Sequence, residues 1–352
     1  MVERHLILIW SEAKDQRDRI IEDVKKHLEL IHAETVRWTP ELFAENLSRL
    51  YGQSLPNNSF KQKHCGTGHI TILIVDDHAP KYEVHDIGSS RGFVSLNSNI
   101  YNLKIKYREW TGGGHKVHAT NDLLESEHDI LLLCHKKPNE FVRSTYDLDS
   151  IVDRDLLGAG GFENLNIFQD VIKTCNDYVF LRGEVSEELF LGKEDLDILV
   201  AEKLDFIFNL NLVHQGKKFS STRYQAKIGN EYIHIDVNSI GDNTYDREWQ
   251  KKMLKNRRLS NDGLYYLDEK NRKYSEIYHN IIHKDIYDSS SQIFLDSLKS
   301  DHGYDITEPN DLMISYFGEK YGGNKPSLKR KVFPLYRDFR YAIHKVKKAI
   351  LS

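Results

Sequence analysis

The first third of the chain alternates short apolar runs with longer amphipathic stretches. Apolar residues dominate residues 5–10, 31–38 and 70–75, which is typical of buried strands. Residues 13–28 carry apolar side chains at helical spacing among charged ones, which predicts a helix. A second helix is expected from Pro40 to residue 51, because proline is tolerated in a first helical turn. This alternation predicts an α/β fold for the N-terminal part of the chain.

The pattern weakens between residues 136 and 161, where Pro138, acidic residues and a glycine-rich segment follow a predicted helix at 123–134. Beyond it the elements resume. We expect helices at 167–175, 202–209, 247–254, 274–283 and 291–298, and strands at 178–181, at 196–200 and up to residue 237. The predicted organisation is an N-terminal α/β domain (1–137), a linker (138–163), a mixed-sheet α+β domain (164–290) and a helical C-terminal extension (291–352).

Composition restricts the class of protein. Of the 352 residues, 39% are hydrophobic and 29% are charged, which is typical of a globular chain. No apolar stretch approaches the roughly 18 residues of a membrane span. The first residues lack the pattern of a signal peptide, and three widely spaced cysteines do not suggest a disulfide framework, so a cytoplasmic location is expected. The net charge of −4 gives no basic field for a nucleic-acid partner.

Two acids on one predicted strand carry the clearest chemical signal. Side chains alternate along a strand, so Asp195 and Asp197 point to one face while Leu196 and Ile198 point into a core. A third acid, Asp236, lies on a later apolar strand. Carboxylate oxygens at this spacing suit Mg²⁺ or Mn²⁺. Acids are disfavoured in strands, so a pair of them on one strand needs an explanation.

A glycine turn precedes the acidic strand. Gly183 follows the predicted strand 178–181, and glycine lets backbone N–H groups approach phosphate oxygens. Arg182 or Lys193 could add positive charge. Nucleotidyl transfer needs these parts: metal ions, a phosphate cradle and a group that takes a proton from the attacking hydroxyl. By contrast, Asp147-Leu148-Asp149 has no glycine turn and no following apolar strand, and is interpreted as linker.

The order glycine turn, Asp-x-Asp strand and third acid resembles the DNA polymerase β-like nucleotidyltransferase superfamily over residues 164–285. The most similar members are bacterial nucleotidyltransferase-like proteins of cell-surface polysaccharide gene clusters. The resemblance implies that Asp195, Asp197 and Asp236 are the catalytic metal ligands. It also implies that a nucleoside triphosphate is the substrate, and that Arg182, Gly183, Ser186 and Lys193 contact nucleotide phosphates. The family usually has serine after the turn glycine. Here Glu184 stands in that place, which weakens the expectation of triphosphate binding more than that of metal binding.

Two N-terminal loops form a second candidate site. Both combine glycines with polar donors, and their candidate ligand-binding residues are His64, Gly66, Gly68, Gly113, Gly114, His115, Lys116 and His118. The second loop is expected to precede a helix capped by Thr120 or Asn121, and Gly112 to Gly114 could form an anion-binding concavity. It is weakly similar to the glycine-rich loop of ParB and sulfiredoxin-type domains, which bind nucleotides.

Other interpretations of these loops remain open. They could be structural turns with packed histidines, or a metal site made of His64, Cys65, His115 and His118. Cys65 could also be a nucleophile beside His64. The C-terminal tail concentrates basic residues on one face of a predicted helix, which indicates either a solvated surface or a polyanion-binding one.

The expected function is Mg²⁺-dependent nucleotidyl transfer to a small, sugar-phosphate or glycan acceptor in surface polysaccharide biosynthesis. Phosphotransfer to a glycan is a variant of the same chemistry. A non-catalytic nucleotide- or polyanion-binding protein and a nucleotidyltransferase toxin are alternatives from other classes. The sequence predicts neither the nucleotide nor the oligomeric state.

Overall fold

The computed structural model describes residues 2–86, 92–188, 195–215, 222–242 and 244–278. The chain divides into two compact units, residues 1–268 and 269–352. In the second unit the structure describes α9 (Glu269–Tyr278), which corresponds to the start of the helix expected at 274–283. The expected helix at 291–298 and the basic tail lie outside the described residues. The domain boundaries expected at 137, 163 and 290 remain predictions.

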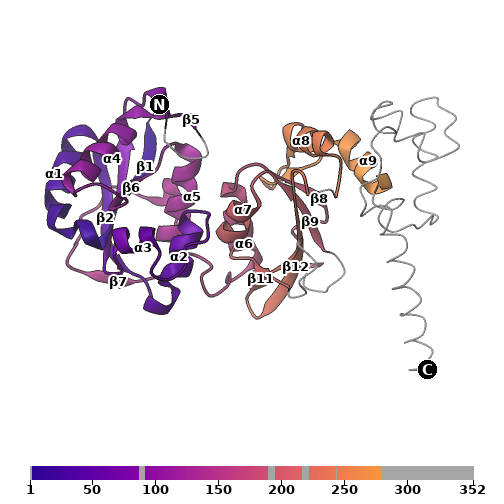
Figure 1. The fold of residues 1–352 in the computed structure, drawn as a ribbon, viewed down its shortest axis with the longest axis horizontal. Helices are drawn as coiled ribbons and strands as arrows, with labels where there is room; N and C mark the ends of the chain where they lie inside the picture. The colour runs from indigo at the N-terminus through magenta and orange to yellow at the C-terminus, as the bar shows by residue number, and fades with distance from the viewer. Residues whose placement is uncertain (1, 87–91, 189–194, 216–221, 243, 279–352) are drawn as a thin grey trace, which may run out of the picture. The chain divides into compact units, whose positions relative to one another are not determined.

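The first unit begins with a five-stranded sheet of order β6-β1-β3-β2-β7 (Figure 1). The central strands β1, β3 and β2 are antiparallel neighbours, β6 is antiparallel to β1, and β7 is parallel to β2. The strand bounds are β1 Glu3–Ile9, β2 Glu29–Arg37, β3 Ile70–Asp77, β6 Val117–Ala119 and β7 Ile151–Asp153. A separate hairpin consists of β4 Tyr82–Asp86 and β5 Phe93–Asn97.

Helices cover both faces of this sheet, because residues on both faces of its strands are apolar. Ile7 and Leu73 pack in one apolar cluster with residues of α1 and α4, whereas Leu6 and Ile74 pack in another with residues of α2 and α5. The helix bounds are α1 Arg17–His27, α2 Phe43–Leu50, α3 Phe60–Cys65, α4 Ser98–Trp110 and α5 Leu123–Cys134. None of the helices in the described residues is long and apolar enough to cross a bilayer.

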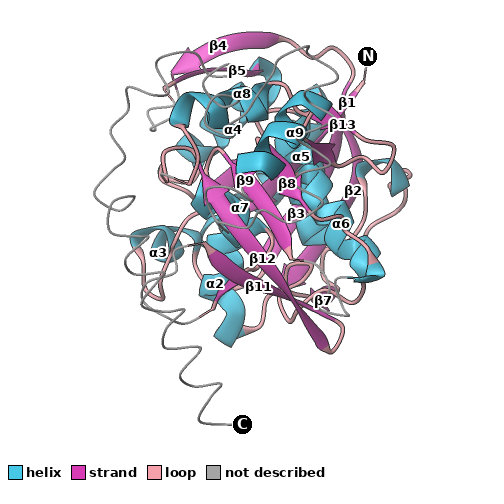
Figure 2. Cartoon of the chain, turned by 90° about the vertical axis from the view of Figure 1, so that its right-hand side faces the viewer, coloured by secondary structure: helices cyan, strands magenta, loops and turns pink. Residues whose placement is uncertain are grey.

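A seven-stranded sheet of order β10-β11-β12-β9-β8-β14-β13 follows. Figure 2 shows β11, β12, β9 and β8 side by side. The strand bounds are β8 Tyr178–Arg182, β9 Leu196–Val200, β10 Val213–His214, β11 Arg223–Ile228, β12 Glu231–Ser239, β13 Arg258–Leu259 and β14 Tyr265–Tyr266. Three further helices are α6 Leu165–Thr174, α7 Lys203–Asn209 and α8 Arg247–Lys255. Together with the first sheet, this arrangement confirms the expected mixture of α/β and α+β structure.

The two sheets share one apolar core. Alternation in β9 and β12 sends Ile198 and Ile235 into the same cluster as Leu6 and Ile74 of the first sheet. Figure 1 shows α6 and α7 along one face of the second sheet. The opposite face carries the acids, so the apolar face anchors the sheet and the polar face is left for chemistry.

Several sequence expectations need correction. The segment expected as linker contains β7, which extends the first sheet through a parallel pairing with β2. The helix expected at 13–28 is a 3-10 helix at Ser11–Gln16 followed by α1. The strand expected at 70–75 extends through Asp76 to Asp77. The helices α3 and α4, the β4–β5 hairpin and β6 were not expected, because their apolar positions are few or irregularly spaced.

Candidate functional site

A row of four charged residues crosses the polar face of the second sheet. Asp197 of β9 and Asp236 of β12 are register partners in a parallel pair. Arg182 of β8 is the register partner of Asp197, after a bulge that follows Phe180, and Arg223 of β11 is the partner of Asp236. The row therefore reads Arg182–Asp197–Asp236–Arg223 across four adjacent strands, which are about 4.8 Å apart. Two acids predicted from distant segments are thus neighbours.

The two arginines are held differently. Arg182 donates from Nε and Nη2 to the Asp197 Oδ2 atom at 2.9 and 2.6 Å. Arg223 Nε lies 4.0 Å from Asp236 Oδ1, and its side chain is 69% exposed. The charge of Arg182 is therefore directed at Asp197, and the Arg223 guanidinium is open to solvent.

The electrostatics of the row are unfavourable for Asp236. Burial raises the pKa of this carboxyl group, and the nearby charges of Asp197 and Asp195 raise it further. Arg223 and Arg182 act in the opposite direction but do not cancel these effects. Asp236 therefore holds a proton more readily than an ordinary aspartate.

The glycine turn lies directly beside the acidic strand. Gly183 has a φ of +76°, and a Cβ atom built on it would lie 2.7 Å from the backbone oxygen of Asp195. A residue with a side chain would therefore be strained and would displace the Asp195 backbone. Glu184 is exposed and Ser186 is partly exposed. Lys193, predicted to contact phosphate, lies outside the described residues.

The three acids lie on one face but do not converge. Asp195 is exposed and comes immediately before β9, one residue from the paired Leu196 and Ile235. The ligand oxygens of these three acids, all in described parts of the chain, do not all lie within 4.8 Å of one another. Two causes keep the carboxylates apart: like charges repel one another, and Arg182 binds the Oδ2 atom of Asp197. The donor set is all oxygen, which fits Mg²⁺ or Mn²⁺ chemically.

Sequence reasoning missed the polar residues on the far side of Asp236. His234 lies two positions from Asp236 on the same face of β12, and its register partner on β11 is Gln225. Gln215 Nε2 lies 2.6 Å from His234 Nδ1 and 2.8 Å from Gln225 Oε1. Alternation backward from Asp236 could have identified His234. Arg223 and Gln225 depend on strand pairing.

The two N-terminal glycine loops meet in space. The rings of His64 and His115 have centroids 6.0 Å apart, and a side chain at Gly114 would collide with His64. Gly112, Gly113 and Gly114 all have positive φ values. Position 114 therefore requires glycine because the loop backbone passes close to the His64 ring, and not because the loop needs to be flexible.

The remaining loop residues are tied to the protein itself. Gly68 N donates to Ser11 Oγ at 3.0 Å, and side chains at Gly66 or Gly68 would meet Ser11. Lys116 Nζ donates to the Thr111 carbonyl oxygen at 2.9 Å. These contacts explain the loops as closed turns. The second loop leads into β6, not into a helix, and Asp122 caps the following helix, not Thr120 or Asn121.

His118 is separated from the loop histidines and faces α5. Its Nε2 atom lies 2.9 Å from Asp129 Oδ2, with both side chains buried. The structure groups His118, Glu125 and Asp129 within 4.8 Å, instead of the expected set of His64, Cys65, His115 and His118. Burial lowers the pKa of His118 to about 3 and raises that of Asp129. His118 is therefore a neutral imidazole at pH 7.

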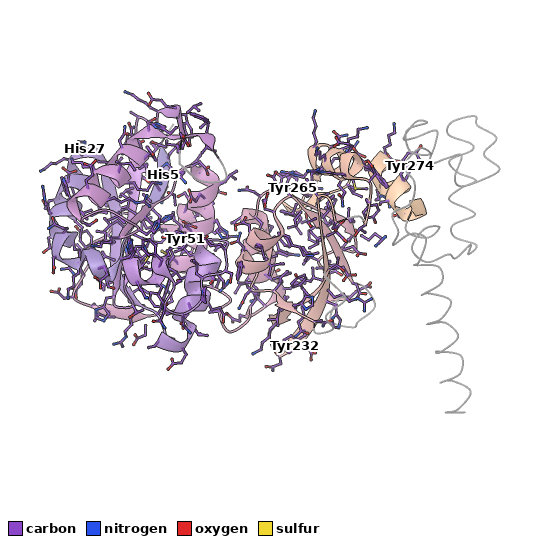
Figure 3. The ribbon with its side chains drawn as sticks, in the orientation of Figure 1. His5, His27, Tyr51, Tyr232, Tyr265 and Tyr274 are labelled. Atoms are coloured by element: carbon purple, nitrogen blue, oxygen red, sulfur yellow. The ribbon has the colours of Figure 1, made fainter. Side chains whose placement is uncertain are left out.

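Cations and an aromatic ring surround this histidine. Tyr51, labelled in Figure 3, packs its ring against His118 at a centroid distance of 5.5 Å. Lys61 Nζ lies 3.4 Å from the centroid of the Tyr51 ring, and burial lowers the pKa of Lys61 to about 8. Lys61, Lys104 and Arg108 all act electrostatically on His118. The histidine therefore has both acids, Glu125 and Asp129, and cations in its surroundings.

Cys65 does not have the properties of a nucleophile. It is fully buried, and burial raises the pKa of its thiol to about 12. A thiol with this pKa is protonated at pH 7, and the thiolate is the reactive form. Cys134 and Cys175 are also buried and free.

Comparisons with known proteins identify no family. No family model matches the chain, and no curated protein matches it. Among solved structures, the nucleoside diphosphate kinase of Aquifex aeolicus is 15% identical, with a TM-score of 0.25. That match covers 37% of this chain and 93% of the kinase chain.

Proposed function

We propose that this protein is a divalent-metal-dependent nucleotidyltransferase that transfers a nucleotidyl group to a hydroxyl of a small acceptor. The observation that carries the proposal is the register of Asp197 with Asp236, beside the turn at Gly183. The ion pair with Arg182 offsets part of the charge of this acid pair, but burial and the neighbouring acids still raise the pKa of Asp236. Its electrostatic cost is explained if a cation and a phosphate occupy this face.

Each group then has a role. Asp195, Asp197 and Asp236 would hold Mg²⁺ or Mn²⁺, which supplies charge neutralisation of the triphosphate when bound. The backbone at Gly183 would donate to phosphate oxygens. Asp236 would accept the proton of the attacking hydroxyl, and its raised pKa favours that role. The acceptor oxygen bonds to the α-phosphorus, the bond from the α-phosphorus to the bridging oxygen breaks, and pyrophosphate leaves with that electron pair.

The acceptor class and the pathway rest on the sequence resemblance alone. A sugar, a sugar phosphate or a glycan of surface polysaccharide synthesis is the proposed acceptor. The exposed Glu184 is compatible with phosphate binding if its carboxylate stays in solvent.

A thermal-shift screen of the four nucleoside triphosphates with Mg²⁺ tests the proposal. We expect one or more nucleotides to raise the melting temperature of the wild-type protein, and Asp197→Asn to remove that rise. Asp149→Asn is the matched control, because it changes the exposed Asp-x-Asp sequence before β7 and should leave the rise intact. The proposal would be contradicted if no nucleotide raised the melting temperature of the wild-type protein. It would also be contradicted if the rise persisted in Asp197→Asn.

We also propose a second candidate function, phosphoryl transfer through His118. The specific observation is the buried His118–Asp129 pair. If Asp129 accepts the Nε2–H, the lone pair lies on Nδ1, for which no hydrogen-bond partner exists in the part of the chain that is described. Lys61, Lys104 and Arg108 supply positive charge for a phosphoryl group. Nδ1 would attack the γ-phosphorus of a nucleoside triphosphate; the N–P bond forms, the β,γ bridging P–O bond breaks, and the diphosphate leaves.

Labelling with γ-³²P nucleoside triphosphate tests this second function. We expect acid-labile, base-stable label on the wild-type protein and none on His118→Asn. His115→Asn, a nearby histidine outside the pair, and Asp197→Asn should both retain the label. Label that persists in His118→Asn would exclude the histidine as the acceptor.

A further inference from the structure

The two ends of the charged row on the second sheet differ in what lies beside them. The glycine turn, where the triphosphate would bind, follows β8 at one end, and β9 and β12 carry the acids in the middle. The attacking hydroxyl would lie near Asp236. Past Asp236, on the side away from the glycine turn, the next strand is β11, whose first residue is Arg223.

Arg223 is built differently from the arginine at the opposite end. Arg182 is bound to its acid at 2.6 Å, with its side chain 21% exposed. Arg223 approaches Asp236 only to 4.0 Å and is 69% exposed. An exposed pair at that distance contributes little to stability, because water screens it. The guanidinium of Arg223 is therefore available to bind an anion with its planar set of donors.

Further polar groups continue the same face beside Arg223. Gln225 lies two residues further along β11, and its register partner His234 lies two residues from Asp236. Gln215 bridges Gln225 and His234. Amide and imidazole groups of this kind suit the hydroxyls of a sugar. With strands about 4.8 Å apart, Arg223 lies about 10 Å from Asp197 across the sheet.

We propose that Arg223 binds a phosphate group of the acceptor, with Gln225 and His234 beside it as hydroxyl-binding groups. The acceptor class is thereby a phosphorylated sugar rather than an uncharged one. This inference rests on the proposed nucleotidyltransferase function. It makes Arg223 a specificity-determining residue, because it would distinguish two acceptors that differ in one phosphate.

Calorimetric titration of glucose 1-phosphate into the Mg²⁺–nucleotide complex tests the inference, with a non-hydrolysable triphosphate to prevent turnover. Glucose is the uncharged counterpart. We expect the wild-type protein to bind glucose 1-phosphate at least tenfold more tightly than glucose, and we expect Arg223→Gln to abolish that preference. Lys227→Gln is the matched control: it is exposed on the same strand, at the hairpin end beside Tyr232, which Figure 3 labels. It should keep the preference.

Two failures can be told apart. If the wild-type protein binds no Mg²⁺–nucleotide complex at all, the proposed function itself fails. If it binds the nucleotide but shows no preference for the sugar phosphate, or if Arg223→Gln retains that preference, only the role of Arg223 is overturned. Binding of inorganic phosphate alone, with the same dependence on Arg223, would support the anion subsite.

Discussion

At the scale of single residues, Asp236 shows how a site conflicts with stability. It is partly buried next to other acids, so its charged form costs free energy in the folded state. Its pKa is raised above the unfolded value, so the folded state binds a proton more readily. Stability therefore falls as pH rises from about 4 through the folded pKa, and the cost is fully present above that pKa.

We predict that Asp236→Asn raises the melting temperature of the metal-free protein at pH 7 by about 2–4 °C, the shift that about 1 kcal/mol produces in a domain of 150–250 residues. The gain should shrink as pH falls toward 4, because the Asp236 carboxyl group then becomes protonated in the folded state and no longer carries the costly charge. Differential scanning calorimetry across this range measures it. Asp153→Asn, which removes a close ion pair with Arg37, should give no such gain. A lower melting temperature for Asp236→Asn at pH 7 would show that the row is stabilising.

At the scale of elements, the turn after β8 sets the position of the acidic strand. The bulge after Phe180 brings Arg182 opposite Asp197, and Gly183 then passes close to the Asp195 backbone. A positive φ alone costs a residue with a side chain about 1–2 kcal/mol. At Gly183 the clash with a backbone atom adds to this cost.

We therefore predict that Gly183→Ala destabilises the protein by more than the matched variant Gly92→Ala. Gly92 also has a positive φ, but no atom of the described residues lies within 4 Å of the position its Cβ would take. Urea denaturation followed by circular dichroism compares the two variants. We expect the difference to be about 1 kcal/mol or more. Equal losses would mean that the Asp195 backbone yields without cost.

The elements also show how far sequence reasoning extended. The strand predicted at 196–200 matches β9, because a run of apolar residues interrupted by one acid defines it clearly. Helix α4 was not predicted, although Asn97 caps it, because the charged Lys104 occupies a position on its buried face. Strand β7 was not predicted either. Its three residues are all exposed, and only their pairing with β2 defines them as a strand.

At the scale of the whole first unit, a buried arginine connects the helices of the two sheets. Arg49 of α2 is fully buried and donates from Nε to the Phe208 carbonyl oxygen at 3.2 Å and from Nη2 to that of Leu157 at 2.6 Å. Phe208 belongs to α7, so Arg49 satisfies carbonyl groups at the end of that helix. Burial lowers the pKa of Arg49 to about 10, but the side chain remains charged at pH 7.

We predict that Arg49→Ala destabilises the first unit by about 3 kcal/mol, because hydrogen bonds to charged groups are worth about 1.5–3 kcal/mol each and buried carbonyls would lose their donors. The midpoint of urea denaturation measures the effect. Arg37→Ala, which removes an exposed ion pair with Asp153, should cost less than about 1 kcal/mol. Similar losses in the two variants would show that the junction contributes little.

The sequence by itself identified the candidate acids and the strand faces on which they lie. Alternation in two short strands put Asp195 and Asp197 on one face and Asp236 on a polar face of its own strand, because that periodicity is local. Tertiary structure alone decided that Asp236 pairs with Asp197, that Arg182 binds Asp197 and that His118 meets Asp129. Those contacts join strands and helices whose pairing depends on which apolar faces are buried together, and a local pattern contains no information about the partner.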